Sequence, residues 1–287
     1  MLSVRQKILV ARGLNTGLRW IRGLAGRKMQ TTVRRGGVAW TLDLDEGIDL
    51  SIYLLGSYEP RTLRAYARTV RPGDVIFDIG ANIGAHTLHF ARLAGPRGRV
   101  YAFEPTDYAF DKLQRNMALN PALASAIHAR QMFLVGSREQ PVPSGVYSSW
   151  PVADAEGDRH EDHCGAVKTT RQARAATADE FCAAEGIDRI DLVKIDVDGH
   201  EAGVIRGFRE NLQRFRPDIL IEIAPFIHDA ADAAELDEVV NFFARLGYVF
   251  LEANSGRVVP ADVRQIRQRI KPGASINALL RHPRAKG

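Results

Sequence analysis

A glycine-rich turn between an apolar segment and a helical segment carries the clearest chemical signal in this sequence. The run Asp78-Ile79-Gly80-Ala81-Asn82-Ile83-Gly84 ends the apolar residues 75–79, and Glu104 closes the next apolar segment twenty residues after Gly84. Gly80 permits a tight turn with close approach of the backbone to a ligand, and Gly84 lets the following helix pack on the sheet. An acid at the end of the second strand can accept hydrogen bonds from both ribose hydroxyls. The pattern predicts a nucleoside-binding loop with Gly80, Gly84 and Glu104 among its contacts.

Two side chains of this loop distinguish between nucleoside ligands. A pyrophosphate favours glycine at the central position and disfavours a neighbouring carboxylate, whereas this chain has Asn82 there and Asp78 at the strand end. S-adenosylmethionine carries an ammonium group and a sulfonium group and no phosphate, so a nearby carboxylate attracts it. We therefore expect S-adenosylmethionine as the cofactor, with Asp78 and Asn82 among its binding residues. A nicotinamide-dependent oxidoreductase is the alternative that this pattern leaves open.

A second group of candidate residues lies where two later apolar segments end. Asp196 follows residues 191–195, His200 comes four residues later, and Glu222 lies within residues 219–223. Ligands of open α/β sheets bind outside the carboxyl ends of the strands, so we expect Asp196, His200 and Glu222 to act on a methyl acceptor. Methyl transfer from a sulfonium is an in-line displacement, which needs an aligned acceptor atom and a route for its proton. These three residues are the predicted catalytic group.

Two ways of activating an acceptor hydroxyl remain open. In the first, the imidazole of His200 accepts the hydroxyl proton, since histidine titrates near neutral pH. In the second, Mg²⁺ holds the oxygen and is bound by Asp196, Asp198 and Glu222, with Glu201 as a further oxygen ligand. Asp198 and Glu201 also have a purely structural interpretation, because acids at the start of a helix stabilise it.

Short apolar segments alternate with helical segments from residue 72 to residue 253, which is typical of strand–helix repeats and a parallel sheet. We expect an α/β fold of the Rossmann-like class, with a mostly parallel sheet of six or seven strands flanked by helices. A polar stretch at 154–170, with His160, His163 and Cys164, is expected to be a solvated loop. The expected strands are 75–79, 99–103, 127–135, 191–195, 219–223 and 248–253.

The pattern divides the chain into three parts. Leu14, Leu18, Ile21 and Leu24 recur at helical spacing, and we expect that helix to pack on the domain. A hairpin at 29–44 and two further helices follow it. The parts are a basic N-terminal helix, hairpin and helical lid (1–70), a methyltransferase domain (71–260) and a basic C-terminal tail (261–287).

Basic residues concentrate at the two ends of the chain. Residues 1–42 contain nine Lys or Arg and no acid, and residues 264–287 contain seven and no acid, although the net charge of the chain is only +5. The middle of the chain is therefore acidic and lacks a basic face interleaved with aromatic residues, so we expect no nucleic-acid partner. The basic ends have three interpretations, contact with an anionic membrane surface, contact with a partner, or exposure to solvent.

Cysteine content and hydropathy bear on the compartment. Cys164 and Cys182 are too few for a disulfide framework or a four-sulfur zinc site. No apolar run approaches the roughly 20 residues of a membrane span. We expect a soluble, cytoplasmic protein, and the sequence leaves its oligomeric state open.

Taken together, the motifs resemble those of the FkbM-type methyltransferases. They are Glu59-Pro60, the run from Val75 to Gly84, Ala102-Phe103-Glu104-Pro105, and the run from Asp191 to Glu201. The resemblance covers residues 55–253 and implies a class I methyltransferase sheet, S-adenosylmethionine as donor, and O-methylation of a hydroxyl on a saccharide or secondary metabolite. We also assign Glu59 and Ser137 to the cofactor-binding residues.

One departure from the family pattern affects the acceptor side. The family usually shows Asp-Val-Glu-Gly, whereas this chain has Asp196-Val197-Asp198-Gly199, whose second acid is one methylene shorter. Any contact made through that acid is therefore shifted. A protein that binds S-adenosylmethionine without transferring its methyl group is the non-enzymatic alternative.

Overall fold

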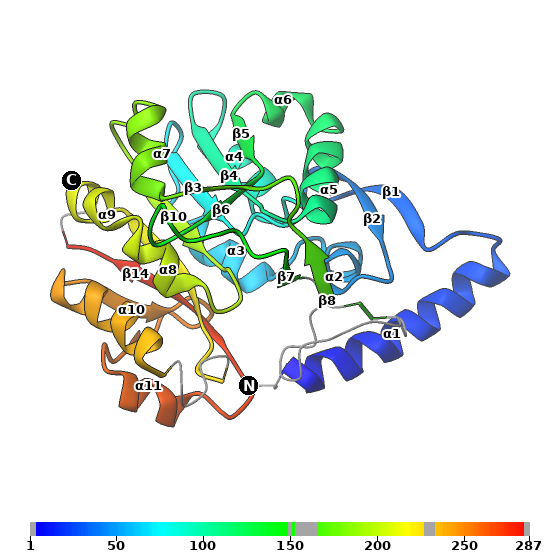
Figure 1. The fold of residues 1–287 in the computed structure, drawn as a ribbon. Helices are drawn as coiled ribbons and strands as arrows, with labels where there is room; N and C mark the ends of the chain where they lie inside the picture. Colours follow the sequence, from blue (N-terminus) through cyan, green and yellow to red (C-terminus); the bar gives the residue numbers. More distant parts are fainter. Residues whose placement is uncertain (1–3, 149–150, 153–165, 227–232, 284–287) are drawn as a thin grey trace.

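An eight-stranded sheet forms the centre of the molecule (Figure 1). The structure is a computed structural model that describes residues 4–148, 151–152, 166–226 and 233–283. Five neighbouring strands are parallel, and the remaining three continue the sheet with antiparallel pairing. In spatial order the strands are β13 (Val258–Val259), β12 (Val249–Glu252), β14 (Ile276–Arg281), β11 (Asp218–Ile223), β10 (Leu192–Ile195), β3 (Val75–Ile79), β4 (Arg99–Phe103) and β5 (Ile127–Arg130).

Helices cover both faces of the sheet, because its central strands are apolar on both sides. Phe77 and Ile79 of β3 face one layer, while Ile76, the residue before Phe77, faces the other. The expected α/β fold is confirmed, with one strand more than the upper number expected. One layer contains α7 (Ala178–Ala184), α8 (Glu201–Arg206), α9 (Arg209–Phe215), α10 (Ala233–Arg245) and α11 (Val263–Arg269), and the other α2 (Gly47–Leu55), α3 (Pro60–Tyr66), α4 (Thr87–Ala94), α5 (Asp107–Ala118) and α6 (Pro121–Ala124).

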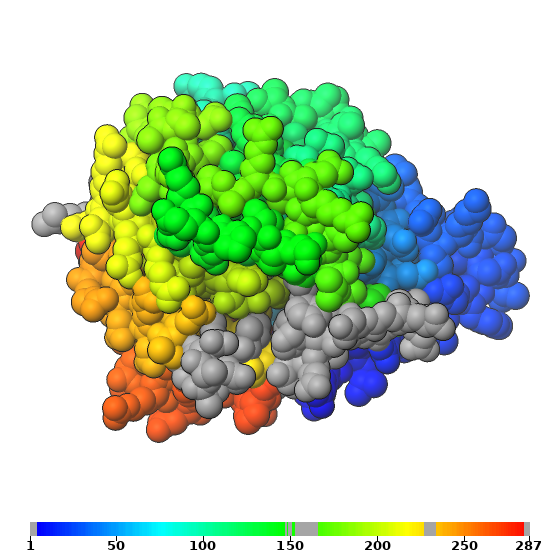
Figure 2. All heavy atoms as spheres, in the orientation of Figure 1, coloured from blue at the N-terminus to red at the C-terminus, as the bar shows by residue number. Residues whose placement is uncertain are grey.

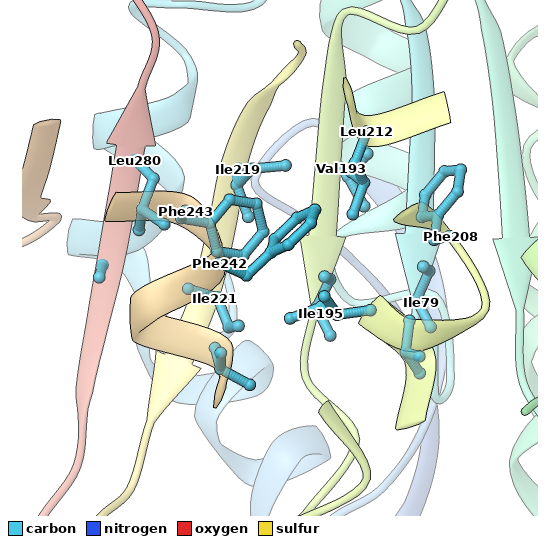
Figure 3. Packing of buried hydrophobic residues seen from close by; sticks show 14 of the residues in the cluster. Ile79, Val193, Ile195, Phe208, Leu212, Ile219, Ile221, Phe242, Phe243 and Leu280 are labelled. Carbon is cyan, nitrogen blue, oxygen red and sulfur yellow. The ribbon is translucent and has the colours of Figure 1, made fainter. Parts of the chain in front are cut away.

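The first of these layers contains the larger hydrophobic cluster. Figure 3 shows Phe242 and Phe243 of α10 beside Ile219 and Ile221 of β11. Side chains that interdigitate in this way hold the strand ends of β10 and β11 in fixed positions. The candidate residues on those two strands therefore lie on a rigid support.

The C-terminal part was expected to be a basic tail, and that prediction is wrong for residues 263–281. β14 lies between β11 and β12, and its Ala278 and Leu280 are fully buried. The helix α11 precedes it and begins at the cap Asp262, whose side chain accepts a hydrogen bond from the backbone of Gln265. Because this stretch is rich in Arg and Lys, the sequence analysis did not recognise its short apolar strand.

The N-terminal helix α1 (Val4–Leu24) precedes a hairpin of β1 (Gln30–Arg35) and β2 (Val38–Asp43). Of Leu14, Leu18, Ile21 and Leu24, which we expected to pack on the domain, Leu18 packs against its core, whereas the other three are exposed. The polar side of the helix also attaches it, because the side-chain amide of Asn15 donates to the backbone oxygen of Leu44 at 2.6 Å. In the part of the chain that the structure describes, no helix has the length and apolarity to cross a membrane.

Two elements expected to be continuous are broken. The expected strand 127–135 splits into β5 and β6 (Met132–Leu134), and β6 leaves the main sheet to pair with β9 (Arg174–Ala176). The helix that the sequence pattern predicts over residues 201–212 splits into α8 and α9 at Gly207, where a Cβ atom would clash with the backbone oxygen of Val135. A separate hairpin consists of β7 (Gly145–Ser148) and β8 (Ala166–Thr169).

Candidate functional site

A cavity of about 510 Å³ opens at the carboxyl ends of β3, β4, β10 and β11. Its size lies in the range of small-molecule sites, and its position is the usual one for ligands of an open α/β sheet. Several residues from α1 and α2 complete its wall. Eight of the sequence-predicted site residues line it: Glu59, Gly80, Asn82, Glu104, Asp196, Asp198, His200 and Glu222.

The turn after β3 brings the backbone against the wall of the cavity. Gly80 has φ = 78°, and a Cβ atom built on it would clash with the backbone oxygen of Asp196. Asn82 has φ = 50°, a left-handed conformation that asparagine tolerates better than most residues. Gly84 does not line the cavity, and a Cβ atom there would lie 2.7 Å from the Cδ1 atom of Leu113 in α5. Gly84 thus acts in helix packing.

Glu104 lies at the end of β4 and is almost completely buried. Its Oε1 atom accepts hydrogen bonds from the backbone and the hydroxyl of Thr106, at 2.9 and 2.5 Å. Its Oε2 atom accepts from the backbone of Asn82 at 2.9 Å. A carboxylate has about four acceptor positions, so these three bonds orient the group and leave capacity for a ligand hydroxyl. Burial nevertheless raises the pKa of Glu104 from its ordinary value.

Asp78 lies beneath the cavity rather than on its surface, which differs from the direct ligand contact that we expected. It is fully buried, and its Oδ2 atom accepts a hydrogen bond from the hydroxyl of Thr87 at 2.6 Å. Its Oδ1 atom lies 3.5 Å from the Nζ atom of Lys194. Burial raises the pKa of Asp78, while Lys194 and Thr87 oppose that rise. The side chain of Asp78 therefore contacts Thr87 and Lys194 and does not line the cavity.

Lys194 is a buried cation at the centre of the site that our sequence reasoning missed. Its Nζ atom lies 3.2 Å from the Oδ2 atom of Asp196 and donates to the backbone oxygen of Gly80 at 3.2 Å. Burial alone would lower the pKa of Lys194, but Asp196 and Asp78 raise it above its ordinary value. A lysine inside an otherwise apolar strand was the sequence signal that could have identified it.

Three carboxyl groups of the cavity interact with Asp196. Burial raises the pKa of Glu222 well above its ordinary value, and the nearby charges of Asp196 and Asp198 add to the rise. Enclosure and the charge of Asp196 likewise raise the pKa of Asp198, whose backbone is left-handed at φ = 48°. Burial and Asp196 also raise the pKa of Glu59 to about 7. The group is thus only partly ionised near neutral pH and favours a cationic ligand.

His200 lines the cavity at the start of α8. Its ring lies edge-on to Phe133, with centroids 5.2 Å apart, and burial lowers its pKa. The imidazole is therefore neutral, and able to accept a proton, at neutral pH. Glu201, the next residue, instead accepts backbone hydrogen bonds from Val197 and Gly199, which supports its structural interpretation.

His86 is a second histidine on the cavity wall, and the sequence reasoning did not select it. Its Nδ1 atom lies 3.2 Å from the hydroxyl of Tyr66, and its Nε2 atom lies 3.9 Å from Glu59. Burial lowers its pKa well below the ordinary value. A neutral histidine beside a partly protonated Glu59 gives this end of the cavity a polar, nearly uncharged wall.

Some of the expected binding and metal-ligating residues are not arranged as a site. Ser137 is exposed and does not line the cavity. Within the described residues, no group of three or more His, Cys, Asp or Glu side chains is arranged to hold a metal ion. The metal set Asp196, Asp198 and Glu222 thus has no geometric support. His160, His163 and Cys164 lie outside the described residues.

The sequence is similar to methyltransferases. The family model described as the methyltransferase FkbM domain matches residues 78–250. Methyltransferase sdnD of Sordaria araneosa is 28% identical over 220 residues, which are 63% of this chain and 82% of that protein.

Two further relatives have more specific names. The hexuronic acid methyltransferase AglP of Haloferax volcanii is 27% identical over 155 residues, 54% of this chain and 58% of AglP. The 31-O-demethyl-FK506 methyltransferase FkbM of Streptomyces tacrolimicus is 26% identical over 243 residues, 74% of this chain and 88% of FkbM.

Proposed function

The chain belongs to the FkbM methyltransferase family, and from this premise we propose that it transfers a methyl group from S-adenosylmethionine to a hydroxyl oxygen of a saccharide or secondary metabolite. The observation that carries the proposal is the single cavity that joins the turn after β3 to the strand ends of β10 and β11. One ligand can therefore contact Glu104 while a second contacts His200 and Glu222.

The charges of the cavity suit this methyl donor. Of the described residues that line it, five are carboxylic acids and two are lysines, of which Lys194 is already paired with Asp196. A ligand with a sulfonium and an ammonium group is attracted to such a wall, whereas a pyrophosphate is repelled. Family membership likewise decides against the nicotinamide alternative.

We assign the half of the cavity beside the turn after β3, here named the donor half, to S-adenosylmethionine. Gly80 and Asn82 shape the turn, and Glu104 has acceptor capacity left for ribose hydroxyls. Asp78 supports this half from below through Lys194. Glu59 adds a carboxyl group beside His86 at the other end of the donor half.

When bound, the donor supplies an electrophilic methyl carbon on a sulfonium. His200, neutral at physiological pH, accepts the proton of the acceptor hydroxyl as the new carbon–oxygen bond forms. Glu222, whose pKa burial raises, positions the acceptor through a hydrogen bond of its carboxyl group. The carbon–sulfur bond breaks with its electrons left on sulfur, so the products are a methyl ether and a neutral thioether.

The names of the relatives support the acceptor class. One is named a hexuronic acid methyltransferase and another a 31-O-demethyl-FK506 methyltransferase. We propose the cytoplasm as the compartment, because the chain has few cysteines and Cys182 is buried and unpaired.

The proposal is tested by incubating the protein with S-adenosylmethionine labelled in its methyl group and a panel of saccharides, uronic acids and polyketide alcohols. Label that survives alkali is a methyl ether, whereas a methyl ester releases labelled methanol. Alkali-stable label on one acceptor is the expected result. Binding of the donor without transfer to any acceptor class supports the scaffold alternative instead. The same assay with EDTA tests whether Mg²⁺ takes part.

A further inference from the structure

The helix α1 presents a continuous apolar surface to solvent. Its exposed apolar residues are 52–72% accessible, and on a helix of 3.6 residues per turn they fall within an arc of about 140° that contains no charged residue. We name this arc the outer face of α1. It consists of Leu9, Val10, Leu14, Trp20, Ile21 and Leu24.

The outer face does not contribute to the core of the protein. The opposite side of the helix holds the buried residues Ile8, Asn15 and Arg22. Arg22 donates through Nε and Nη2 to the backbone oxygen of Lys28, at 3.0 and 2.6 Å. The helix is thus anchored on one side and exposed on the other, and the N-terminal part of the chain, in blue, projects from the body at the right of Figure 2. Contiguous apolar patches of this kind mark interaction sites, unlike single exposed leucines.

The outer face is continuous with the mouth of the cavity. Val10 and Leu14 belong to it and also line the cavity. Leu54 and Leu55 of α2 are exposed and line the same wall. A partner that covers the outer face would therefore lie at the cavity mouth.

Charge indicates the chemistry of this partner. The exposed cations Arg5 and Lys7 flank the apolar arc on its two sides, and residues 1–42 contain no acid. A second copy docked through the same face would bring two cationic helices together, which is unfavourable. An anionic lipid surface matches both the apolar arc and the cations around it. Trp20, 69% exposed, is a residue type that concentrates at membrane interfaces.

We propose that the outer face of α1 docks on an anionic lipid surface and brings the cavity mouth against it. The helix lies in the plane of the interface, with its apolar arc among the acyl chains and its cations at the headgroups. This role extends beyond methyl transfer and does not depend on the identity of the acceptor.

The test is co-sedimentation of the full chain with phosphatidylcholine vesicles that contain or lack phosphatidylglycerol. We expect binding only to the anionic vesicles, and weaker binding at high salt. The double substitution Trp20→Glu/Ile21→Glu should weaken binding about a hundredfold, because two large apolar groups are lost from the interface. Neither residue lines the cavity, so affinity for S-adenosylhomocysteine should not change.

The matched control is Val249→Glu/Val258→Glu, which places the same two charges on exposed apolar residues of β12 and β13. This variant should bind the anionic vesicles as the wild type does. Equal binding of the double variant and the wild type would overturn the proposal. The proposal would also be overturned if the wild type were a dimer that does not bind vesicles and the double variant were a monomer. The outer face would then dock on a second copy of the chain.

Discussion

The Nζ atom of Lys194 lies 3.2 Å from the Oδ2 atom of Asp196, and this ion pair connects the two halves of the site. The same ammonium group lies 3.5 Å from Asp78 below the donor loop and donates to the backbone oxygen of Gly80. A buried cation thus fixes the turn after β3 and the end of β10 relative to each other. The alignment that an in-line displacement requires depends on this arrangement.

The first prediction is that Lys194→Met destabilises the protein by about 3–5 kcal/mol, because it leaves the buried Asp78 without its cation. Lys112→Met is the matched control, since Lys112 forms a buried 2.5 Å pair with Asp49 away from the cavity. Urea unfolding should show comparable losses for the two variants. Only Lys194→Met should also lower the turnover of the remaining folded protein. Equal turnover of the two folded variants would contradict the assignment of Lys194 to the site.

The second prediction concerns Glu104. In Glu104→Gln an NH2 group replaces one of the two accepting oxygens. This group can only donate, and it faces the donors of Thr106 or Asn82. Affinity for S-adenosylhomocysteine should fall about ten- to a hundredfold, since hydrogen bonds to charged groups are worth roughly 1.5–3 kcal/mol. Glu185→Gln, which alters an exposed pair with Arg130, should bind as the wild type does. Calorimetric titration compares the two, and unchanged affinity in Glu104→Gln would contradict its assignment.

The third prediction is a pH profile. If His200 is the base, turnover rises with pH as the imidazole loses its proton, and burial places the midpoint below the ordinary value of 6.5. His200→Ala should lower kcat by about 10²–10⁴-fold and leave donor affinity unchanged. His128→Ala, on the outer strand β5, serves as the control.

A different pattern would indicate the metal mechanism. Loss of turnover with EDTA, recovery with Mg²⁺ and a chelator-like effect of Asp196→Asn would favour the ion over His200. Full activity of His200→Ala without any effect of EDTA would leave alignment by the pocket as the source of catalysis.

The fourth prediction uses Glu59, whose pKa burial raises from 4.5 to about 7. Between these values the folded protein holds a proton that the unfolded chain releases. The contribution of Glu59 to the free energy of unfolding is therefore greatest below this window and falls as pH rises through it, by at most about 1.4 kcal/mol per pH unit. His86, with its lowered pKa, contributes the opposite slope. The difference between wild type and Glu59→Gln in urea unfolding isolates Glu59, and identical pH slopes would exclude its raised pKa.

Local patterns predicted most of the sheet and the nucleoside loop. The parallel strands alternate with helices, so the apolar runs marked β3, β4, β10 and β11 correctly. Gly80 and Glu104 were recognisable because a turn and a strand end impose specific residue types. These features depend on a few adjacent residues and on general rules of α/β sheets.

Features that depend on distant contacts were not predictable. β14 became visible only through its pairing with β11 and β12, since its sequence surroundings are basic. The buried position of Asp78 follows from Lys194, more than a hundred residues later in the chain. The face that α1 turns to the domain follows from hydrogen bonds of Asn15 and Arg22, whereas helical periodicity indicated the apolar side.

Titration of the wild-type protein with S-adenosylhomocysteine and, separately, with NAD⁺ tests the central claim most directly. The donor half of the cavity, with Asn82 in place of a glycine and carboxylic acids around it, should bind S-adenosylhomocysteine at a single site and give no heat with NAD⁺. Binding of NAD⁺ alone, or of neither ligand by a folded protein, would contradict the account.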